Sequence, residues 1–388
     1  GSIMAAMEPS PTRDLAHDQN SPKNIPFDLI FEILSRLPAK SIIRFLSVCK
    51  LWYSTIRSKD LADSFLIHSK TRPRLLFTFK HFDSRKRFIF SAPEHGTEEN
   101  SSTARHDMTM SDLVYYIKSL PVNGLICCTR GSSIAVCNPT TRQILKLPDV
   151  TLNERDMYAR LGYDPVQDQY KVLCVMMHDG FDSRTKDNIE QEHFVFTLGC
   201  QQQEWRKIEF IDVGDPYTDV KGGICISGGI YYVIGHKKIA RFDVRSEKVE
   251  LINAPQEDML NEEDIKKVIV YHSSDDITTI NAHCWTLEDE SWNIMTCDVP
   301  TEWGDLFRDK GLSSTGDIHT GEVMLVSDTL ESSKPFTVYY YDMIRESFRS
   351  ATVEGIADSE FRRGIHGFGK RNRDMLCFPG HIENIMFF

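Results

Sequence analysis

Several side chains in this sequence could do chemistry, but their spacing matches no known catalytic or metal site. His366, Cys377 and His381 lie near one another in the sequence and could be proposed as metal ligands. The acidic residues within 257–264 could be proposed as a Ca²⁺ site, but they lack the ligand spacing of a calcium loop. There is no GxSxG, P-loop, GxGxxG or HExxH motif. We therefore expect no catalytic residue, no metal and no cofactor, and interpret these groups as ordinary strand and loop residues.

The cysteines also favour a structural role. There are ten and no CxxC pair, and five of them lie within apolar runs: Cys127, Cys128, Cys137, Cys174 and Cys225. This pattern indicates small buried side chains in a reducing compartment, because a reactive thiol needs a polar, electropositive setting. Residues 1–24 are polar and lack the apolar stretch of a signal peptide, and no apolar run approaches the roughly 18–20 residues that span a bilayer. We expect a cytoplasmic and/or nuclear protein without a membrane partner.

The charge is distributed unevenly. The chain carries −11 overall, but residues 23–87 hold 14 Lys/Arg and 5 Asp/Glu, a net +9, whereas residues 1–22 carry −2 and residues 88–388 carry −18. A basic region on an acidic body is typical of a module that meets an acidic partner. Nucleic acid is the alternative partner. The basic residues alternate with large apolar ones and the acidic body would repel phosphates, so we expect no nucleic-acid partner.

Residues 25–68 have the apolar spacing of short helices. Pro26 and Asp28 suit a first helical turn, and the apolar residues within 29–37 recur at steps of three and four, which gives one stripe. Pro38 ends this helix.

A second apolar set follows in residues 40–54 and a third, shorter one in residues 61–66, so we predict three helices. A module of about 40 residues cannot hide so many apolar side chains by itself. The side chains either pack on the rest of the chain or form a surface for another protein, and the apolar pattern leaves both open.

The stretch 25–41, followed by Arg44-Phe45 and 48–52, resembles a plant-type F-box, and the resemblance covers residues 25–68. F-boxes dock on the acidic Skp-family adaptor of SCF (Skp–cullin–F-box) ubiquitin ligases, and the local +9 charge fits such an adaptor. The resemblance places these residues at that interface or in its supporting core: Pro26, Leu29, Ile30, Ile33, Leu34, Leu37, Pro38, Ile43, Phe45, Val48, Cys49 and Trp52.

From Arg74 onward the pattern changes to short β-rich runs that end at Gly, Pro, Asn or Asp, which predicts an all-β domain. The runs recur as four-strand units of about 35–50 residues. These units span residues 115–148, 160–210, 222–252, 266–298 and 312–352. Phe242-Asp243, Tyr341-Asp342 and Trp285-Thr286 each end a strand before a polar turn.

The remaining segments, 74–91 and 367–388, each supply about two strands. Joined, they make one more sheet that closes a ring and removes two exposed sheet edges. We therefore predict a six-bladed β-propeller closed by strands from both ends of the domain. Two β-sandwiches are the structural alternative, since one sandwich rarely absorbs more than about 300 residues.

The whole chain is thus predicted as an α+β multidomain protein: a disordered tail over 1–24, a three-helix module over 25–68 and an all-β propeller over 69–388. The string 162–165 (Gly-Tyr-Asp-Pro), the run 170–175 and Trp205-Arg206 are similar to plant proteins with F-box-associated interaction domains. That family is related in pattern to kelch-type F-box proteins, whose double glycine appears clearly only in the 222–229 region.

The resemblance implies a non-catalytic substrate-recognition subunit of an SCF ubiquitin ligase. It would be joined through the adaptor to cullin and RING subunits and would hold a protein substrate for ubiquitination and degradation. The alternative is a propeller-type enzyme or small-ligand binder whose helical module packs internally.

Loops between second and third strands and between blades share one propeller face. Here they are 92–112, 149–159, 178–191, 212–221, 255–266, 299–311 and 329–335. Exposed aromatics and arginines are the usual binding anchors, which gives six candidate substrate contacts: Phe181, Arg184, Tyr217, Trp303, Phe307 and Arg308.

Overall fold

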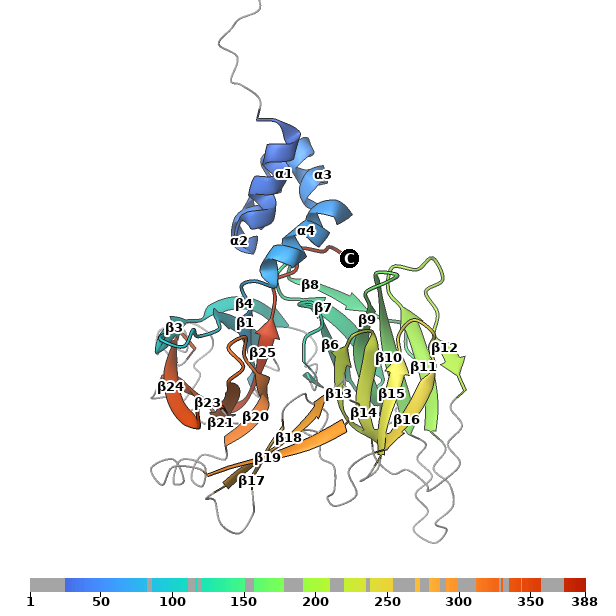
Figure 1. Cartoon of the computed structure of the whole chain (residues 1–388). Helices are drawn as coiled ribbons and strands as arrows, with labels where there is room; N and C mark the ends of the chain where they lie inside the picture. The colour runs from blue at the N-terminus through green and yellow to red at the C-terminus, as the bar shows by residue number, and fades with distance from the viewer. Residues whose placement is uncertain are drawn as a thin grey trace, which may run out of the picture.

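The computed structural model of the chain consists of a small helical module standing on one end of a ring of β-sheets (Figure 1). It describes residues 25–81, 86–110, 116–117, 120–150, 157–177, 191–209, 220–234, 238–253, 269–272, 279–286, 291–298, 312–327, 329–330, 335–342, 344–356 and 373–388. The tail predicted for residues 1–24 lies outside these residues. Within them, no helix has the length and apolar character needed to cross a membrane.

The helical module has four helices in its described residues rather than the predicted three: α1 (Phe27–Arg36), α2 (Ala39–Phe45), α3 (Lys50–Ile56) and α4 (Lys59–Ser69). The second predicted helix is divided because the chain turns between α2 and α3. The Ser47 hydroxyl donates to the Arg44 carbonyl at 3.1 Å, and Cys49 is extended with φ −161°. Such side-chain bonds compete with helix continuation. Pro26 and Pro38 directly precede α1 and α2, as their preset φ favours.

The strands form six sheets in the described residues. In hydrogen-bonding order, the closing sheet holds β22 (Thr329–Leu330), β25 (Arg373–His381), β1 (Arg74–His81), β2 (Lys86–Pro93) and β4 (Arg105–Met110), and the next holds β5 (Tyr116–Ile117), β6 (Ile126–Arg130), β7 (Ser133–Asn138) and β8 (Gln143–Lys146). The third sheet holds β12 (Arg206–Ile208), β11 (Gln191–Thr197), β10 (Gln169–Met177) and β9 (Met157–Asp164), and the fourth holds β13 (Val220–Ile226), β14 (Gly229–Ile234), β15 (Lys238–Asp243) and β16 (Val249–Asn253). The fifth sheet holds β17 (Ile269–His272), β18 (Thr279–Thr286) and β19 (Ser291–Asp298), and the sixth holds β20 (Leu312–Asp317), β21 (Val323–Ser327), β23 (Phe336–Asp342), β24 (Ser347–Glu354) and β3 (Ser101–Thr103).

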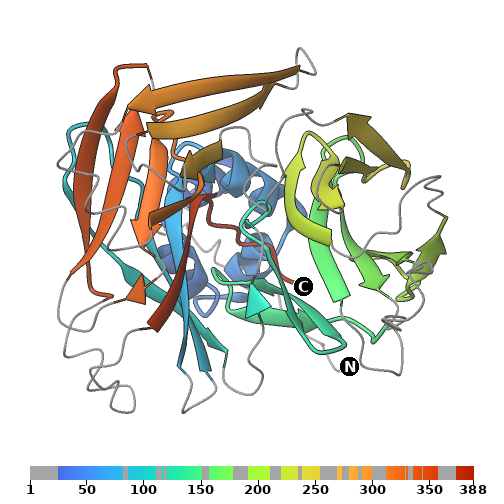
Figure 2. The ribbon, with the colours of Figure 1, turned by 90° about the horizontal axis from the view of Figure 1, so that it is seen from below.

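These sheets are arranged around a ring, as the view along it shows (Figure 2), so the predicted propeller is confirmed. Five sheets have the four or five strands of a full blade, and the sheet β17–β18–β19 has three described strands. The described residues therefore contain five complete blades rather than the predicted six, together with one sheet of three strands.

The ring is closed by strands from both ends of the domain, as predicted, but in a different proportion. β25 pairs antiparallel with β1, so the C-terminal segment supplies one main strand and the N-terminal segment supplies β1, β2 and β4. The expected two-and-two division is therefore not found in the described residues, which leave out 367–372. β25 ends in a bulge at Pro379 and Gly380, where the register shifts and Gly380 has φ +68°. The chain then leaves the sheet after His381.

The segment 92–112 was predicted as a substrate-side loop, and this is wrong. It contains β3, which pairs in parallel with β24, and β4, which completes the closing sheet. Pro93 lies opposite Arg74, the first residue of β1 after the helices, so the connection from β2 runs at the helical end of the sheets.

A recurring turn reverses the chain at this same end. Asn138, Asp164 and Asp342 each end a strand, and each side-chain oxygen accepts a hydrogen bond from the backbone N–H two residues on, at 3.1, 2.9 and 2.9 Å. Asp243 accepts from Ser246 N–H at 3.2 Å. Such side-chain bonds fix tight turns. The polar turns expected after Phe242-Asp243 and Tyr341-Asp342 are therefore present, whereas the residues after Thr286 lie outside the described residues.

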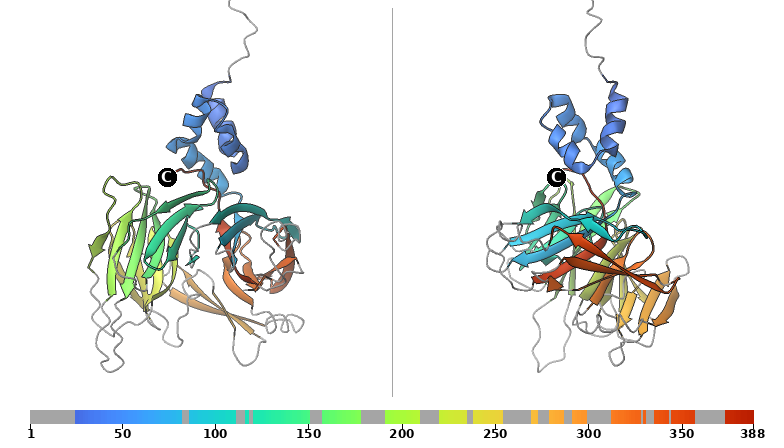
Figure 3. Two further views of the ribbon diagram at one scale, coloured as in Figure 1. Left: turned by 180° about the vertical axis from the view of Figure 1, so that it is seen from behind. Right: turned by 90° about the vertical axis from the view of Figure 1, so that its left-hand side faces the viewer.

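The helical module lies at one end of the strands, and the strand ends that flank the predicted substrate loop 178–191 lie at the other. The turns β7–β8 and β9–β10 meet the helices, and β10 ends and β11 begins at the other end of the sheet. Two further views show the helices projecting from one side of the ring (Figure 3).

Gly124 tests how closely the C-terminal tail packs on the propeller. It has φ +78°, and a Cβ added there would lie 2.2 Å from the Ile382 carbonyl oxygen. Gly131 has φ +54° with nothing within 4 Å of an added Cβ. Gly124→Ala and Gly131→Ala share the backbone strain, but only the first displaces the tail. We expect urea denaturation to show that Gly124→Ala lowers the free energy of unfolding by about 1–3 kcal/mol more than Gly131→Ala does. Equal losses would contradict this tight contact.

Candidate functional site

Helix α1 carries large apolar side chains on its solvent side. Phe27, Leu29 and Ile33 are 52%, 49% and 50% exposed, and Leu29 and Ile33 lie one turn apart on the same face. Val48, in the turn between α2 and α3, is 58% exposed, and Leu51, in the first turn of α3, is 55% exposed. We call these five residues the exposed apolar set. So much exposed apolar surface on a short module is typical of an interaction site.

The twelve residues predicted for adaptor docking divide by burial. Six are exposed: Pro26, Leu29, Ile33, Pro38, Val48 and Cys49. Five are half-buried: Ile30, Leu37, Ile43, Phe45 and Trp52. Leu34 alone of the twelve is fully buried. The Phe45 and Trp52 rings meet edge to face with centroids 5.0 Å apart. The set thus combines surface and supporting positions, as the resemblance implies, and contact with an adaptor stays a prediction.

Sequence reasoning missed Phe27 and Leu51, which are as exposed as the predicted residues. Both lie within the string that carries the resemblance, and both are large apolar side chains outside the buried stripe of their helices. That mismatch with an amphipathic pattern is the signal that could have identified them.

The core of the helical module is completed by a residue from the far end of the chain. Ile385 is fully buried in the same cluster as Leu34, Ile42, Ile56 and Phe65. The neighbouring Phe387 packs against this cluster. The strands predicted for 367–388 place this tail in the closing sheet, although the apolar run at its end was a visible signal of a separate packing site.

Side-chain hydrogen bonds hold the same tail on the propeller. The buried Asn138 amide donates to the carbonyls of Asn384 and Met386 at 2.8 and 2.9 Å. The Asn384 amide in turn donates to the Asn123 carbonyl at 2.8 Å. These side-chain amides form the hydrogen bonds that a neighbouring strand would otherwise form with the tail. The tail therefore connects the two parts of the molecule, fixed to the propeller and inserted into the helices.

Polar contacts add to this junction. Lys59 of α4 forms an ion pair of 2.5 Å with Asp168 in the β9–β10 turn, and Asp168 also accepts from the Tyr163 hydroxyl at 2.6 Å. The hydrogen bond to Asp168 raises the pKa of Lys59, and Lys59 lowers the pKa of Asp168. Because Lys59 is mostly exposed, this ion pair contributes little to the free energy of unfolding and mainly helps to orient α4 on the β9–β10 turn. Arg72 donates to the last carbonyls of α1 at 3.1 and 3.0 Å.

A buried charged cluster lies where the tail leaves the sheet. Glu383 lies 3.8 Å from Arg74 and 3.5 Å from Arg105, and Arg105 also bonds Asp107 at 2.6 Å. His381 is buried beside these groups. Burial, reinforced by the positive charge of Arg74, lowers the pKa of His381 to about 3. The imidazole is therefore neutral at physiological pH.

Four of the five cysteines predicted to be buried are buried, and Cys225 is half-buried. Cys127, Cys128, Cys137 and Cys174 are buried free thiols, and burial raises the pKa of Cys127 to about 12, which opposes thiolate formation. No group of three or more His, Cys, Asp or Glu side chains that could hold a metal occurs among the described residues. His366 and residues 257–264 lie outside those residues.

All six predicted substrate contacts also lie outside the described residues: Phe181, Arg184, Tyr217, Trp303, Phe307 and Arg308. Their role stays a prediction.

Two known families match this architecture. Residues 23–63 match the F-box domain, and residues 74–382 match the F-box associated beta propeller domain. The chain belongs to the F-box proteins with this propeller. The resemblance in the sequence is thus confirmed, and the helical module is an F-box.

Relatives of this F-box protein extend over its whole length. F-box protein At1g30790 from Arabidopsis thaliana is 34% identical, over 94% of this chain and 98% of its own. F-box protein At2g21930 from the same plant is 32% identical over 96% of each chain, and F-box protein DOR is 31% identical over 96% and 95%.

The F-box should depend on Ile385. Ile385→Ala removes a fully buried side chain from the F-box core, which typically costs about 2–5 kcal/mol. We expect faster hydrogen–deuterium exchange in α1 and α4. Met386→Ala is the matched control, because Met386 packs on the propeller cluster and not on the F-box cluster. Equal exchange in α1 and α4 for the two variants would show that the tail does not stabilise the F-box.

His381 should make stability depend on pH. Its pKa is about 3 when folded and about 6.5 when unfolded, so only the unfolded chain takes up the proton as pH falls below about 6.5. The contribution of neutral His381 to the free energy of unfolding is fully present above that pH, and it decreases by about 3 kcal/mol by pH 4.5. We expect urea denaturation at pH 7 and 4.5 to show that the free energy of unfolding decreases less in His381→Gln than in the wild type, by about 3 kcal/mol. Identical decreases in the two proteins would contradict a neutral, buried His381.

Proposed function

We propose that this F-box protein is the substrate-recognition subunit of an SCF ubiquitin ligase, docking on a Skp-family adaptor through its F-box and binding a protein substrate through its propeller. The observation that carries the proposal is the exposed apolar set. The F-box core is filled by Ile385, and yet Leu29 and Ile33 remain about half exposed. An apolar face left over after the intramolecular contacts are made is best explained by a separate protein.

Charge supports an acidic adaptor. Residues 23–87 carry +9 and residues 88–388 carry −18, so the F-box region contrasts with the body to which it is attached. Complementary charge increases the rate of association and favours the correct partner. Through this adaptor the chain would join cullin and RING subunits.

The arrangement also suits a receptor that performs no chemistry. Ubiquitin transfer would belong to a separate conjugating enzyme, and this chain would raise the effective concentration of substrate lysines. The F-box lies at one end of the strands, and β10 ends and β11 begins at the other end, where one of the loops proposed to hold the substrate would lie. The substrate would then be ubiquitinated and degraded. The free buried thiols are consistent with action in the cytoplasm and/or nucleus.

Ile33 gives the sharpest test of docking. Ile33→Asp places a charge in the exposed apolar set without disturbing the buried core, whereas Leu34 is unsuitable because it is fully buried. We expect titration of the full chain with a purified Skp-family adaptor to show at least about tenfold weaker binding. Ile67→Asp is the matched control, since Ile67 is 66% exposed on α4 and outside the predicted docking residues.

Circular dichroism of both variants separates loss of docking from loss of folding. If the Ile33→Asp variant is folded and binds the adaptor as tightly as the Ile67→Asp variant, that result would contradict the proposed docking face.

A further inference from the structure

A basic pocket lies between the F-box and the propeller. It has a volume of about 270 Å³ and three walls: α2, β4 and the β7–β8 turn. Its charged groups are Lys40 and Arg44 from α2, Arg105 and Asp107 from β4, and Arg142 from the turn. With neutral His106, these groups sum to a net charge of +3. The +9 charge that supports adaptor docking includes Lys40 and Arg44, but it does not include Arg105 and Arg142, which belong to the propeller.

The positive groups in the pocket are not all neutralised by the protein. Arg105 is occupied, because it bonds Asp107 at 2.6 Å and lies 3.5 Å from Glu383. Lys40, Arg44 and Arg142 form no side-chain hydrogen bond or ion pair with any residue that the structure describes. Three exposed cations without a protein partner among the described residues thus surround one small cavity.

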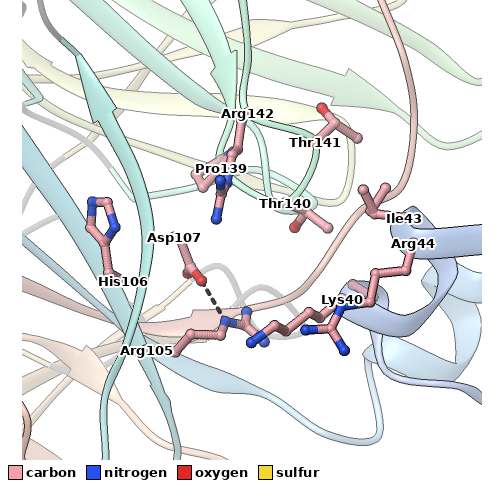
Figure 4. A pocket seen from close by; sticks show the side chains of 11 residues that line it. Lys40, Ile43, Arg44, Arg105, His106, Asp107, Pro139, Thr140, Thr141 and Arg142 are labelled. Carbon is pink, nitrogen blue, oxygen red and sulfur yellow. Dashed lines mark hydrogen bonds and ion pairs between the residues drawn. The ribbon is translucent and has the colours of Figure 1, made fainter.

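The side chains come from opposite sides of this space. The close view shows Lys40 and Arg44 extending from α2 on the side of Arg105, and Arg142 extending from the turn across the cavity (Figure 4). The nearby charge of Arg142 also acts on His106, whose pKa is lowered mainly by burial and further by that guanidinium. The imidazole therefore adds no further charge at neutral pH.

We propose that this pocket binds a small anion with several negative charges, of the kind that carries two or more phosphate groups. Arginine guanidinium groups bind phosphate oxygens through paired, charge-assisted hydrogen bonds, and lysine adds a compact positive charge. The cavity lies at the lower limit of the roughly 300–1,000 Å³ typical of small-molecule sites, so a small ligand fits it better than a folded partner.

The position of the pocket gives the anion a structural consequence. Lys40 and Arg44 belong to the F-box, and Arg142 belongs to the propeller. A polyanion that bonds both sets would bridge the two domains beside the tail. Because such a ligand binds the docked arrangement and not the separated domains, it would stabilise that arrangement by mass action.

Tripolyphosphate is a suitable probe, used with the full chain in isothermal titration calorimetry. We expect saturable binding that weakens as salt concentration rises. Arg142→Gln and Arg142→Glu should weaken it by about tenfold or more, since each removes a charge-assisted contact. Arg142 lies on the propeller, outside the predicted adaptor contacts. Lys248→Glu is the control, because it changes an exposed basic residue in another blade and should stay within about twofold of the wild type.

The outcomes separate the proposal from its alternatives. Thermal unfolding monitors the fold of each variant, and the neutral Arg142→Gln serves if Arg142→Glu is unstable. Absence of tripolyphosphate binding, or equal weakening by the Lys248→Glu control, overturns the proposal. A phosphoserine peptide that binds at Arg142 when tripolyphosphate does not would assign the pocket to a protein ligand and overturn it as well. Loss of adaptor affinity in Arg142→Gln without any anion binding would likewise overturn it.

Discussion

The antiparallel pairing of β25 with β1 is the contact on which the rest of this structure depends. It joins strands from the two ends of the propeller in one sheet, with Phe77 opposite Cys377. Neither strand is therefore left with an open edge at this point of the ring. It also sets Arg74, which follows the F-box, opposite His381, which precedes the tail. Both connections therefore leave the ring at one point, and this is why residues 382–388 reach the F-box.

The F-box is consequently attached to the propeller by more than a linker. Ile385 enters its core, Asn138 holds the tail backbone, and Lys59 reaches the β9–β10 turn. Buried apolar and amide contacts of this kind restrain orientation better than an exposed ion pair does. The distance between the docking face and the far end of the propeller is thereby set by packing, and a receptor of this design would present its substrate from a fixed position.

Features set by near neighbours in the chain could be predicted from the sequence, whereas most features set by distant contacts, apart from the closure of the ring, could not. The α1 stripe, the prolines before α1 and α2 and the turns at Asp243 and Asp342 follow from local spacing. The division of the second helix and the parallel pairing of β3 depend on tertiary context. The predicted docking residues form a recognisable motif. In contrast, no local pattern indicates that Ile385 packs in the F-box core or that Arg142 and Lys40 line one pocket.

The insertion of Ile385 also bears on how the protein is made. The ribosome synthesises the F-box before the propeller, and Ile385 only after the propeller strands. During translation the F-box therefore exists without one of its core residues, and its apolar surface is then largest. A chain interrupted within the propeller keeps a weakened F-box. The tail in this way makes a well-folded F-box depend on a completed propeller.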